Sequence, residues 1–299
     1  MLDALDHVIL AVEDLTAATR NYARLLGRSP SWRGEHPSMG TANTLFRLSN
    51  MYLELLCPEG DGPVADMLRL RMAEHGEGPA GLAFRTQDAA ACHEAWTKAG
   101  LHPSEPAAGL GRDIESGAFR EWTNVFLPPA DTRGVLMFAI EHRTPEETLP
   151  ESPLMAEASA CIGGLDHIVV QTRAPEAGVR LYGEQLGLRL GLDREFPKWG
   201  SRLIFFRVGG VTVELAAQLQ EEGDSAATLD EDRLWGLSWR VADADAAQAR
   251  MAEAGLDVSE VRDGRKPGTK VFSVRGPTNG VPTLVKQPLP RDEPALSGA

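Results

Sequence analysis

The sequence is poor in cysteine and in long apolar runs, and each shortage excludes a class of protein. The three cysteines, Cys57, Cys92 and Cys161, are odd in number and show no CxxC spacing, which argues against a disulfide framework or a cysteine zinc site. We expect them to be small buried hydrophobic residues. No apolar run approaches the roughly 18 residues of a membrane span, and the first residues are acidic where a secretory signal is basic. The sequence therefore predicts a soluble cytoplasmic protein with no membrane partner.

Basic residues are also scarce relative to acidic ones. The chain has 30 Lys and Arg against 43 Asp and Glu, a formal net charge of −13. This balance argues against nucleic acid or an anionic membrane surface as the main partner. A small-molecule substrate or another protein remains, and a homodimer is left open.

What the sequence does contain is an internal duplication. The hexapeptide at residues 5–10, Leu-Asp-His-Val-Ile-Leu, recurs at residues 165–170 as Leu-Asp-His-Ile-Val-Val. At the same spacing, Glu54-Leu55 matches Glu214-Leu215. A repeat on this scale, in a chain whose length alone favours about two domains, predicts two similar domains. The predicted division is a first domain at 1–148, a linker at 149–160, a second domain at 161–290 and a flexible tail at 291–299.

Local patterns predict an α+β fold made of four βαβββ modules, two in each half. In the first module an apolar strand precedes a helix that Asp14 opens and Gly27 ends. The predicted strands are 5–12, 31–33, 43–48, 51–56, 81–85, 112–116, 119–127, 134–141, 165–171, 202–208, 211–217, 234–241, 269–274 and 282–287; the other predicted helices are 64–74, 88–99, 175–186 and 244–254. Because loop closure is less costly over short separations, we expect modules to pair within each half.

Two such modules side by side form a cup whose inward residues come from the first and last strands of each module. A carboxylate inside a Leu-Glu-Leu strand needs a cation or a network of donors, so ligand-type residues at these positions favour a metal site. In the first half these positions hold His7, Glu54, Gly81 and Glu141, and in the second they hold His167, Glu214, Gly236 and Gln287.

This arrangement resembles the vicinal oxygen chelate superfamily, which includes glyoxalase I, methylmalonyl-CoA epimerase, extradiol dioxygenases and the bleomycin-resistance proteins. The resemblance rests on the two Leu-Asp-His strand openings, on the strands at 52–55 and 212–215, and on the strand end at Glu141. The stretch 36–43, His-Pro-Ser-Met-Gly-Thr-Ala-Asn, followed by Tyr-Leu-Glu-Leu, is similar to a glyoxalase-like family.

The resemblance implies a divalent metal ion, Fe, Mn, Zn or Ni, with His7, Glu54 and Glu141 as ligands. A second and weaker set is His167, Glu214 and Gln287. Glu54 and Glu141 would be the catalytic carboxylates. From their own positions, His36, Thr41 and Asn43 are predicted to bind the substrate: His36 could line the mouth of the pocket or replace the missing ligand, and Thr41 and Asn43 could donate to a substrate oxygen or shape the turn. By strand alternation His142 is expected to point away from the cup.

We therefore expect a metal-dependent enzyme that acts on a small molecule with adjacent oxygen atoms, by lyase, isomerase or dioxygenase chemistry. The alternative is a metal-free protein that sequesters a small molecule, as bleomycin-resistance proteins do. The second half is expected to be degenerate or to bind an anionic or aromatic group.

Overall fold

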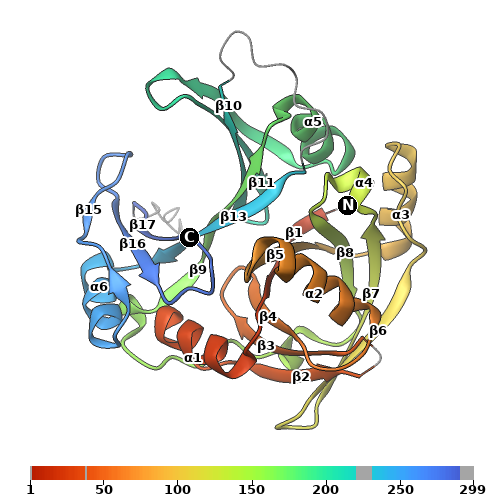
Figure 1. Ribbon diagram of the computed structural model, residues 1–299, viewed down its shortest axis with the longest axis horizontal. Helices are drawn as coiled ribbons and strands as arrows, with labels where there is room; N and C mark the ends of the chain where they lie inside the picture. Colours follow the sequence, from red (N-terminus) through yellow and green to blue (C-terminus); the bar gives the residue numbers. More distant parts are fainter. Residues whose placement is uncertain (1, 38, 220–230, 290–299) are drawn as a thin grey trace, which may run out of the picture.

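Two tandem domains, each built around a curved β-sheet, make up the protein (Figure 1). The computed structural model describes residues 2–37, 39–219 and 231–289, so the predicted tail at 291–299 lies outside the described residues. Within these ranges no helix is long and apolar enough to cross a membrane. All three cysteines are free and buried, as expected.

The first domain is a closed barrel with the strand order β1-β4-β3-β2-β6-β7-β8-β5. Its strands are β1 (Leu2–Ala11), β2 (Trp32–His36), β3 (Thr41–Arg47), β4 (Tyr52–Pro58), β5 (Gly78–Thr86), β6 (Ala107–Asp113), β7 (Phe119–Leu127) and β8 (Leu136–His142). The barrel closes through β2 and β6, where Gly34 is paired with Asp113. Both modules of this barrel come from the first half, so the prediction that modules pair within halves is confirmed here.

The helices of the first domain are α1 (Leu15–Leu26), α2 (Pro63–His75), α3 (Ala89–Lys98) and the short α4 (Pro129–Thr132). The predicted ends of α1 are confirmed. The Asp14 side chain accepts from the backbone N–H of Ala17, and Gly27 ends the helix with a left-handed φ of 68°, a conformation that favours glycine. These caps satisfy backbone groups that the helix itself leaves unpaired.

Helix α2 packs against β4 and covers part of the barrel interior. Its Leu68 and Met72 join one apolar cluster with Ile9, Ala11 and Leu56 from β1 and β4. Since residues two apart on a strand share a face, Ile9 and Ala11 lie on the same inward face as His7. The part of the barrel interior next to α2 is therefore filled with apolar side chains.

The second domain is an open sheet with the order β10-β11-β12-β9-β13-β17-β16-β14, and β15 pairs with β16. Its strands are β9 (Ile162–Thr172), β10 (Arg189–Phe196), β11 (Ser201–Val208), β12 (Val211–Gln218), β13 (Arg233–Val241), β14 (Asp257–Val258), β15 (Arg262–Asp263), β16 (Lys270–Gly276) and β17 (Thr283–Gln287). The sequence prediction missed β10, because this edge strand is exposed along most of its length and lacks a buried apolar face.

Helices α5 (Pro175–Val179) and α6 (Ala244–Glu253) cover the second sheet, and α5 continues as the π-helix η3 (Arg180–Gln185). A short 3₁₀ turn, η4 (Pro197–Trp199), follows β10, and η1 (Glu146–Thr148) and η2 (Ala158–Ala160) lie in the segment between the domains. The boundaries proposed for the two domains and the linker stay a prediction.

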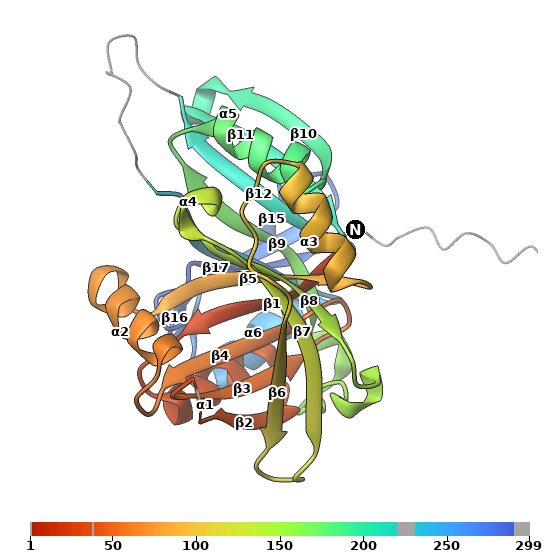
Figure 2. The same ribbon diagram turned by 90° about the vertical axis from the view of Figure 1, so that its right-hand side faces the viewer.

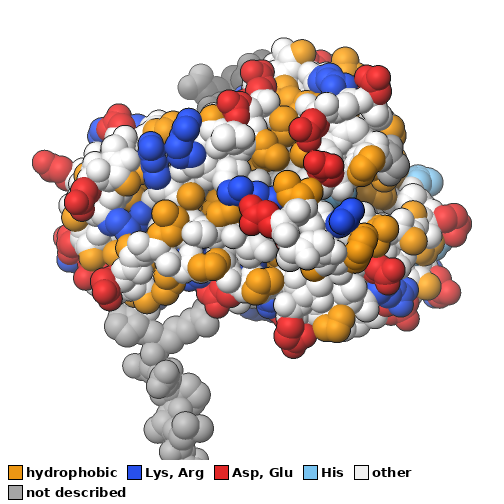
Figure 3. All heavy atoms as spheres, turned by 90° about the horizontal axis from the view of Figure 1, so that it is seen from below, with side chains coloured by type: hydrophobic (Ala, Val, Ile, Leu, Met, Phe, Trp, Pro, Cys, Tyr) orange, Lys and Arg blue, Asp and Glu red, His pale blue; other side chains and the backbone are white. Residues whose placement is uncertain are grey.

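Polar contacts join the two domains, which lie against each other in Figure 2. The Tyr22 hydroxyl donates to the Thr278 carbonyl at 3.1 Å, and Arg28 Nε donates to the Ile162 carbonyl at 2.8 Å. On the face drawn in Figure 3, acidic, basic and apolar side chains are interspersed.

Candidate active site

A histidine and a glutamate meet inside the barrel of the first domain. The parallel pairing of β1 and β4 places His7 opposite Tyr52, two residues before Glu54. Because residues two apart on a strand share a face, the imidazole and the carboxylate point to the same side. His7 Nε2 lies 3.4 Å from Glu54 Oε2, and both side chains are buried. The predicted convergence of these two side chains is confirmed, whereas their chemical roles stay a prediction.

Beside His7 lies a fully buried carboxylate, Asp6. Asp6 Oδ1 is 2.8 Å from His7 Nδ1, and Oδ2 is 2.9 Å from His142 Nε2 and 3.0 Å from Arg85 Nε. A register irregularity between β1 and β5 at this point lets two consecutive residues reach one network. Burial raises the pKa of Asp6, but the hydrogen bonds and charges of His142 and His7 outweigh it, so this pKa lies well below its usual value. Asp6 is therefore ionised at neutral pH and holds a proton on His7 Nδ1.

The three polar residues predicted to bind substrate lie on β2 and β3. Asn43 Nδ2 donates to Glu54 Oε1 at 2.7 Å, and His36 Nδ1 is 3.1 Å from Thr41 Oγ1. Burial lowers the pKa of His36, and the charge of Arg120 lowers it further while that of Glu54 opposes the shift. His36 is therefore a neutral imidazole near neutral pH. The role of these residues in substrate binding stays a prediction.

Glu141 lies outside this cluster. Its Oε2 accepts from the backbone N–H of Ala89, the first residue of α3, at 2.9 Å. On β8 it is the next residue, His142, that turns inward and contacts Asp6. The expectations that Glu141 faces the cup and that His142 points away are both wrong. Which of two neighbouring residues faces inward depends on the register of β8 with its partner strands, and the local sequence does not contain that information.

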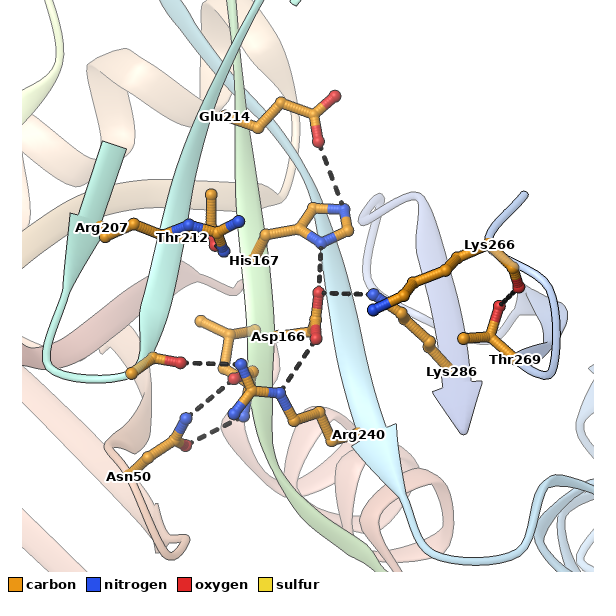
Figure 4. Close-up of polar contacts among 12 residues, drawn as sticks. Asn50, Asp166, His167, Arg207, Thr212, Glu214, Arg240, Lys266, Thr269 and Lys286 are labelled. Atoms are coloured by element: carbon orange, nitrogen blue, oxygen red, sulfur yellow. Dashed lines mark hydrogen bonds and ion pairs between the residues drawn. The ribbon is translucent and has the colours of Figure 1, made fainter. Parts of the chain in front are cut away.

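The second domain repeats the histidine–glutamate pair in a more open setting (Figure 4). His167 Nε2 lies 3.6 Å from Glu214 Oε2, and His167 Nδ1 lies 2.9 Å from Asp166 Oδ1. Asp166 is also contacted by Arg240 Nε at 2.9 Å and Lys286 Nζ at 3.3 Å. The His167 and Glu214 side chains are 20% and 16% exposed, against 3% and 11% for the first pair. Burial nevertheless raises the pKa of Glu214.

Gln287 occupies the place of Glu141 in the second domain. Its Oε1 accepts from the backbone N–H of Ala244, the first residue of α6, at 2.9 Å. An unpaired backbone N–H at the start of a helix needs a hydrogen-bond acceptor. An amide oxygen and a carboxylate oxygen both supply one, so Gln287 can cap α6 as Glu141 caps α3. The predicted set of His167, Glu214 and Gln287 is therefore corrected: the first two meet, and the third caps a helix.

Both halves of the chain match families of one superfamily. Residues 5–159 match the family described as glyoxalase-like domain, and residues 166–272 match the glyoxalase/bleomycin resistance protein/dioxygenase superfamily. The chain belongs to this superfamily. Its two domains are tandem members of the vicinal oxygen chelate fold, as the resemblance implied.

Individual relatives agree with this assignment. An ethylmalonyl-CoA/methylmalonyl-CoA epimerase from Cereibacter sphaeroides is 30% identical over 146 residues, which are 46% of this chain and 96% of that protein. A variant of 4-hydroxymandelate synthase from Streptomyces coelicolor superposes with a TM-score of 0.65 at 16% identity, over 96% of this chain and 92% of that one. A hypothetical protein from Staphylococcus aureus gives a TM-score of 0.65 at 10% identity, over 95% and 99%. These two structures share the fold.

The superfamily resemblance implies a divalent metal held from four strand positions, and the first domain has ligand atoms at two of them. On β4 Glu54 lies two residues beyond Tyr52, the partner of His7; in the other module Phe138 lies two residues beyond Leu136, the β8 partner of Gly81. Neither Gly81 nor Phe138 has a metal-binding atom. Among residues 2–37, 39–219 and 231–289, no group of three His, Cys, Asp or Glu side chains could hold a metal ion. The residues present do not fit a metal site with three protein ligands.

The strand positions assigned to the missing ligand hold glycine in both domains. On β5, Gly81 is paired with Ile9, and Ala83 is paired with His7. In the second domain Gly236 is paired with Val169, and Ser238 with His167. Residues two apart on a strand share a face, so each glycine lies on the same face as the residue paired with the histidine, but it has no side chain to bind a metal.

Four residues around the first pair were missed by sequence reasoning. Asp6 had a usable signal, because an aspartate precedes the histidine in both copies of the repeat. Tyr52 stacks on His7 with ring centroids 4.4 Å apart. His142 was assigned to the wrong face, and Arg120 on β7 has no local signal at all, since only the closed barrel brings it near Tyr52.

Proposed function

We propose that the first domain is an enzyme that transfers a proton to or from a small organic acid, with His7 and Glu54 as the acid–base pair. The observation that carries the proposal is the buried chain from Asp6 through His7 and Glu54 to Asn43, with successive contacts of 2.8, 3.4 and 2.7 Å. General acid–base catalysis needs a proton-transferring side chain in a fixed orientation, and this chain of contacts supplies one.

In the proposed step the Glu54 carboxylate removes a proton from a substrate carbon next to a carbonyl group. The electron pair of the broken C–H bond moves onto the carbonyl oxygen, giving an enolate. Thr41 and the neutral His36 donate hydrogen bonds to that oxygen; for Thr41 this is the role that the sequence predicted. His7 Nε2 shares the proton that Glu54 has taken, and Asp6 stabilises the imidazolium that forms. Return of the proton to either face of the carbon completes the reaction.

The type of substrate follows from this chemistry. The relative that is 30% identical over 46% of this chain is named an ethylmalonyl-CoA/methylmalonyl-CoA epimerase, and epimerisation beside a carbonyl is a proton transfer. We therefore propose a carboxylic acid, or its thioester, with an acidic C–H group. Of the outcomes that the sequence left open, isomerase or lyase chemistry fits this step.

The metal-dependent form of the hypothesis, with Fe, Mn, Zn or Ni, is not used in this mechanism. His7 and Glu54 would give an ion two protein ligands, and Asp6 is already engaged by Arg85, His142 and His7. A dioxygenase outcome, which requires such an ion, is for that reason not proposed.

The alternative function, sequestration of a small molecule without turnover, makes a different prediction. Substituted malonates and their thioesters are incubated with the full chain in D₂O, and loss of the acidic C–H signal is followed by proton NMR. We expect enzyme-dependent exchange that Glu54→Gln removes. A ligand that binds but exchanges no faster than in buffer would support sequestration and contradict the proposal.

A further inference from the structure

A second feature of the first barrel is a buried arginine without an acidic partner. Arg120 lies on β7 and is 6% exposed. Its guanidinium carbon lies 5.6 Å from the ring centroid of Trp32, 5.3 Å from that of Tyr52 and 6.0 Å from that of Trp122. In the described part of the chain, no carboxylate lies within ion-pair distance of Arg120, whereas nearby Arg85 is paired with Asp6. Arg120 is therefore a buried cation that aromatic rings surround but no anion neutralises.

The aromatic rings leave the hydrogen-bonding capacity of this guanidinium largely unused. An arginine has five N–H donors and no acceptor, and the rings around Arg120 offer these donors mainly their π faces. Burial raises the pKa of Tyr52 well above its usual value, so Tyr52 is a neutral phenol and supplies no charge. Burying a cation without an anionic partner is costly. An anion that enters from solvent would remove this cost.

A cavity next to Arg120 gives such an anion a place. It has a volume of about 210 Å³ and is lined by Arg120, Tyr52, Arg85, His142 and Arg47 among others. Two carboxylates also line it, but both are engaged: Glu141 by the start of α3 and by Arg143, and Glu146 by Arg47. Sites for drug-sized ligands have volumes of about 300–1,000 Å³. This cavity fits a small acid, or the acid end of a larger molecule.

The cavity adjoins the proposed acid–base pair. Tyr52 lines the cavity on one side and stacks on the His7 ring on the other, with an interplanar angle of 19°. His142, which also lines the cavity, contacts the same Asp6 that holds His7. An anionic group at Arg120 would therefore lie one aromatic ring away from His7.

We propose that Arg120 is the anion-binding residue of the first domain and that it binds a carboxylate of the ligand in this cavity. The inference rests on the proposed function, because it names the group by which the substrate would be recognised. A planar carboxylate matches the paired N–H groups of a guanidinium, and its carbon chain can lie against the faces of Tyr52 and Trp122.

The test is calorimetric titration of the full chain with malonate at pH 7, with inorganic phosphate and sulfate as further probes. We expect Arg120→Gln to weaken malonate binding at least tenfold. Arg120→Lys keeps the charge but loses the two-pronged geometry, so an intermediate loss is expected. The matched control is Arg112→Gln, which removes an exposed arginine on β6 that contacts Phe119, and its affinity should stay within twofold of the parent.

Several results would overturn the inference. One is equal malonate affinity in parent and Arg120→Gln; another is phosphate or sulfate binding more tightly than malonate, which would assign the site to a different oxyanion. If Arg120→Gln fails to fold by circular dichroism, Arg120→Lys decides, and unchanged affinity in that variant contradicts the inference. Glu54→Gln separates the two proposals. If this variant still binds malonate but no longer catalyses deuterium exchange, both proposals are supported. If Arg120→Gln exchanges deuterium at the parent rate, the role of Arg120 is contradicted and the acid–base proposal is not.

Discussion

Replacing Asp6 by asparagine tests the network that orients His7. Three nitrogen atoms contact the Asp6 carboxylate: His7 Nδ1 at 2.8 Å, His142 Nε2 at 2.9 Å and Arg85 Nε at 3.0 Å. A hydrogen bond to a charged group contributes about 1.5–3 kcal/mol, and removing one charge of a buried pair costs about 3–5 kcal/mol. Asparagine keeps one acceptor oxygen, so we expect Asp6→Asn to lower the free energy of unfolding by about 3 kcal/mol, a large part of the roughly 5–15 kcal/mol of a typical protein.

The duplication supplies a matched control for this substitution. Asp166 makes the same contact with His167, but it is 14% exposed on its side chain while Asp6 is fully buried. Water compensates part of a lost contact at an exposed site, so Asp166→Asn should cost about 1.5 kcal/mol, the lower end of the range for such hydrogen bonds. The measurement is urea unfolding followed by tryptophan fluorescence at pH 7.

The pH dependence of the Asp6→Asn effect has a definite sign. Folding lowers the pKa of Asp6 well below the ordinary value of 3.8, so the ionised carboxylate stabilises the fold above that pH and loses this effect as the pH falls toward the folded-state pKa. The difference between parent and variant should therefore narrow below pH 3.8. A loss of less than about 1 kcal/mol at pH 7, well under the cost of breaking a buried pair, or a difference that widens in acid, would refute the reasoning.

Three further expectations follow from the site. Glu141→Gln should leave stability close to the parent value, because Gln287 makes the same cap in the second domain, whereas Glu141→Ala should lose about 0.5–2 kcal/mol by urea unfolding. His36 should titrate by proton NMR below its ordinary pKa of 6.5; a midpoint above that value would contradict its burial. Dialysis against EDTA should change neither the melting temperature nor malonate affinity, and a drop in either would restore the metal hypothesis.

The elements that the sequence predicted well are those fixed by local chemistry. The two Leu-Asp-His strands could be placed because both copies carry the same apolar alternation. Helix α1 could be bounded because Asp14 and Gly27 meet needs that any helix has at its ends. The meeting of His7 with Glu54 followed from the fold resemblance together with a shared inward face.

The errors concern residues whose position depends on contacts distant in the sequence. Glu141 and His142 exchanged faces because the register of β8 is set by strands elsewhere in the barrel. Strand β10 was missed because it contributes little to the core and so shows no apolar alternation. Arg120 was not predicted as a site residue because no sequence motif surrounds it. The aromatic rings that contact it belong to β2, β4 and its own strand, β7. Only the closure of the barrel brings those rings together.

The central claim is that the first domain carries the acid–base pair, and the duplication allows a direct measurement. Glu54→Gln and Glu214→Gln make the same change in the two domains, each beside a histidine that an aspartate holds. Deuterium incorporation at the acidic carbon of a substrate that the parent exchanges is compared in the two variants by proton NMR. The account predicts that Glu54→Gln lowers the exchange rate at least a hundredfold, in line with the usual contribution of a general acid–base group, and that Glu214→Gln leaves it unchanged. Loss of exchange in Glu214→Gln with retention in Glu54→Gln would contradict it.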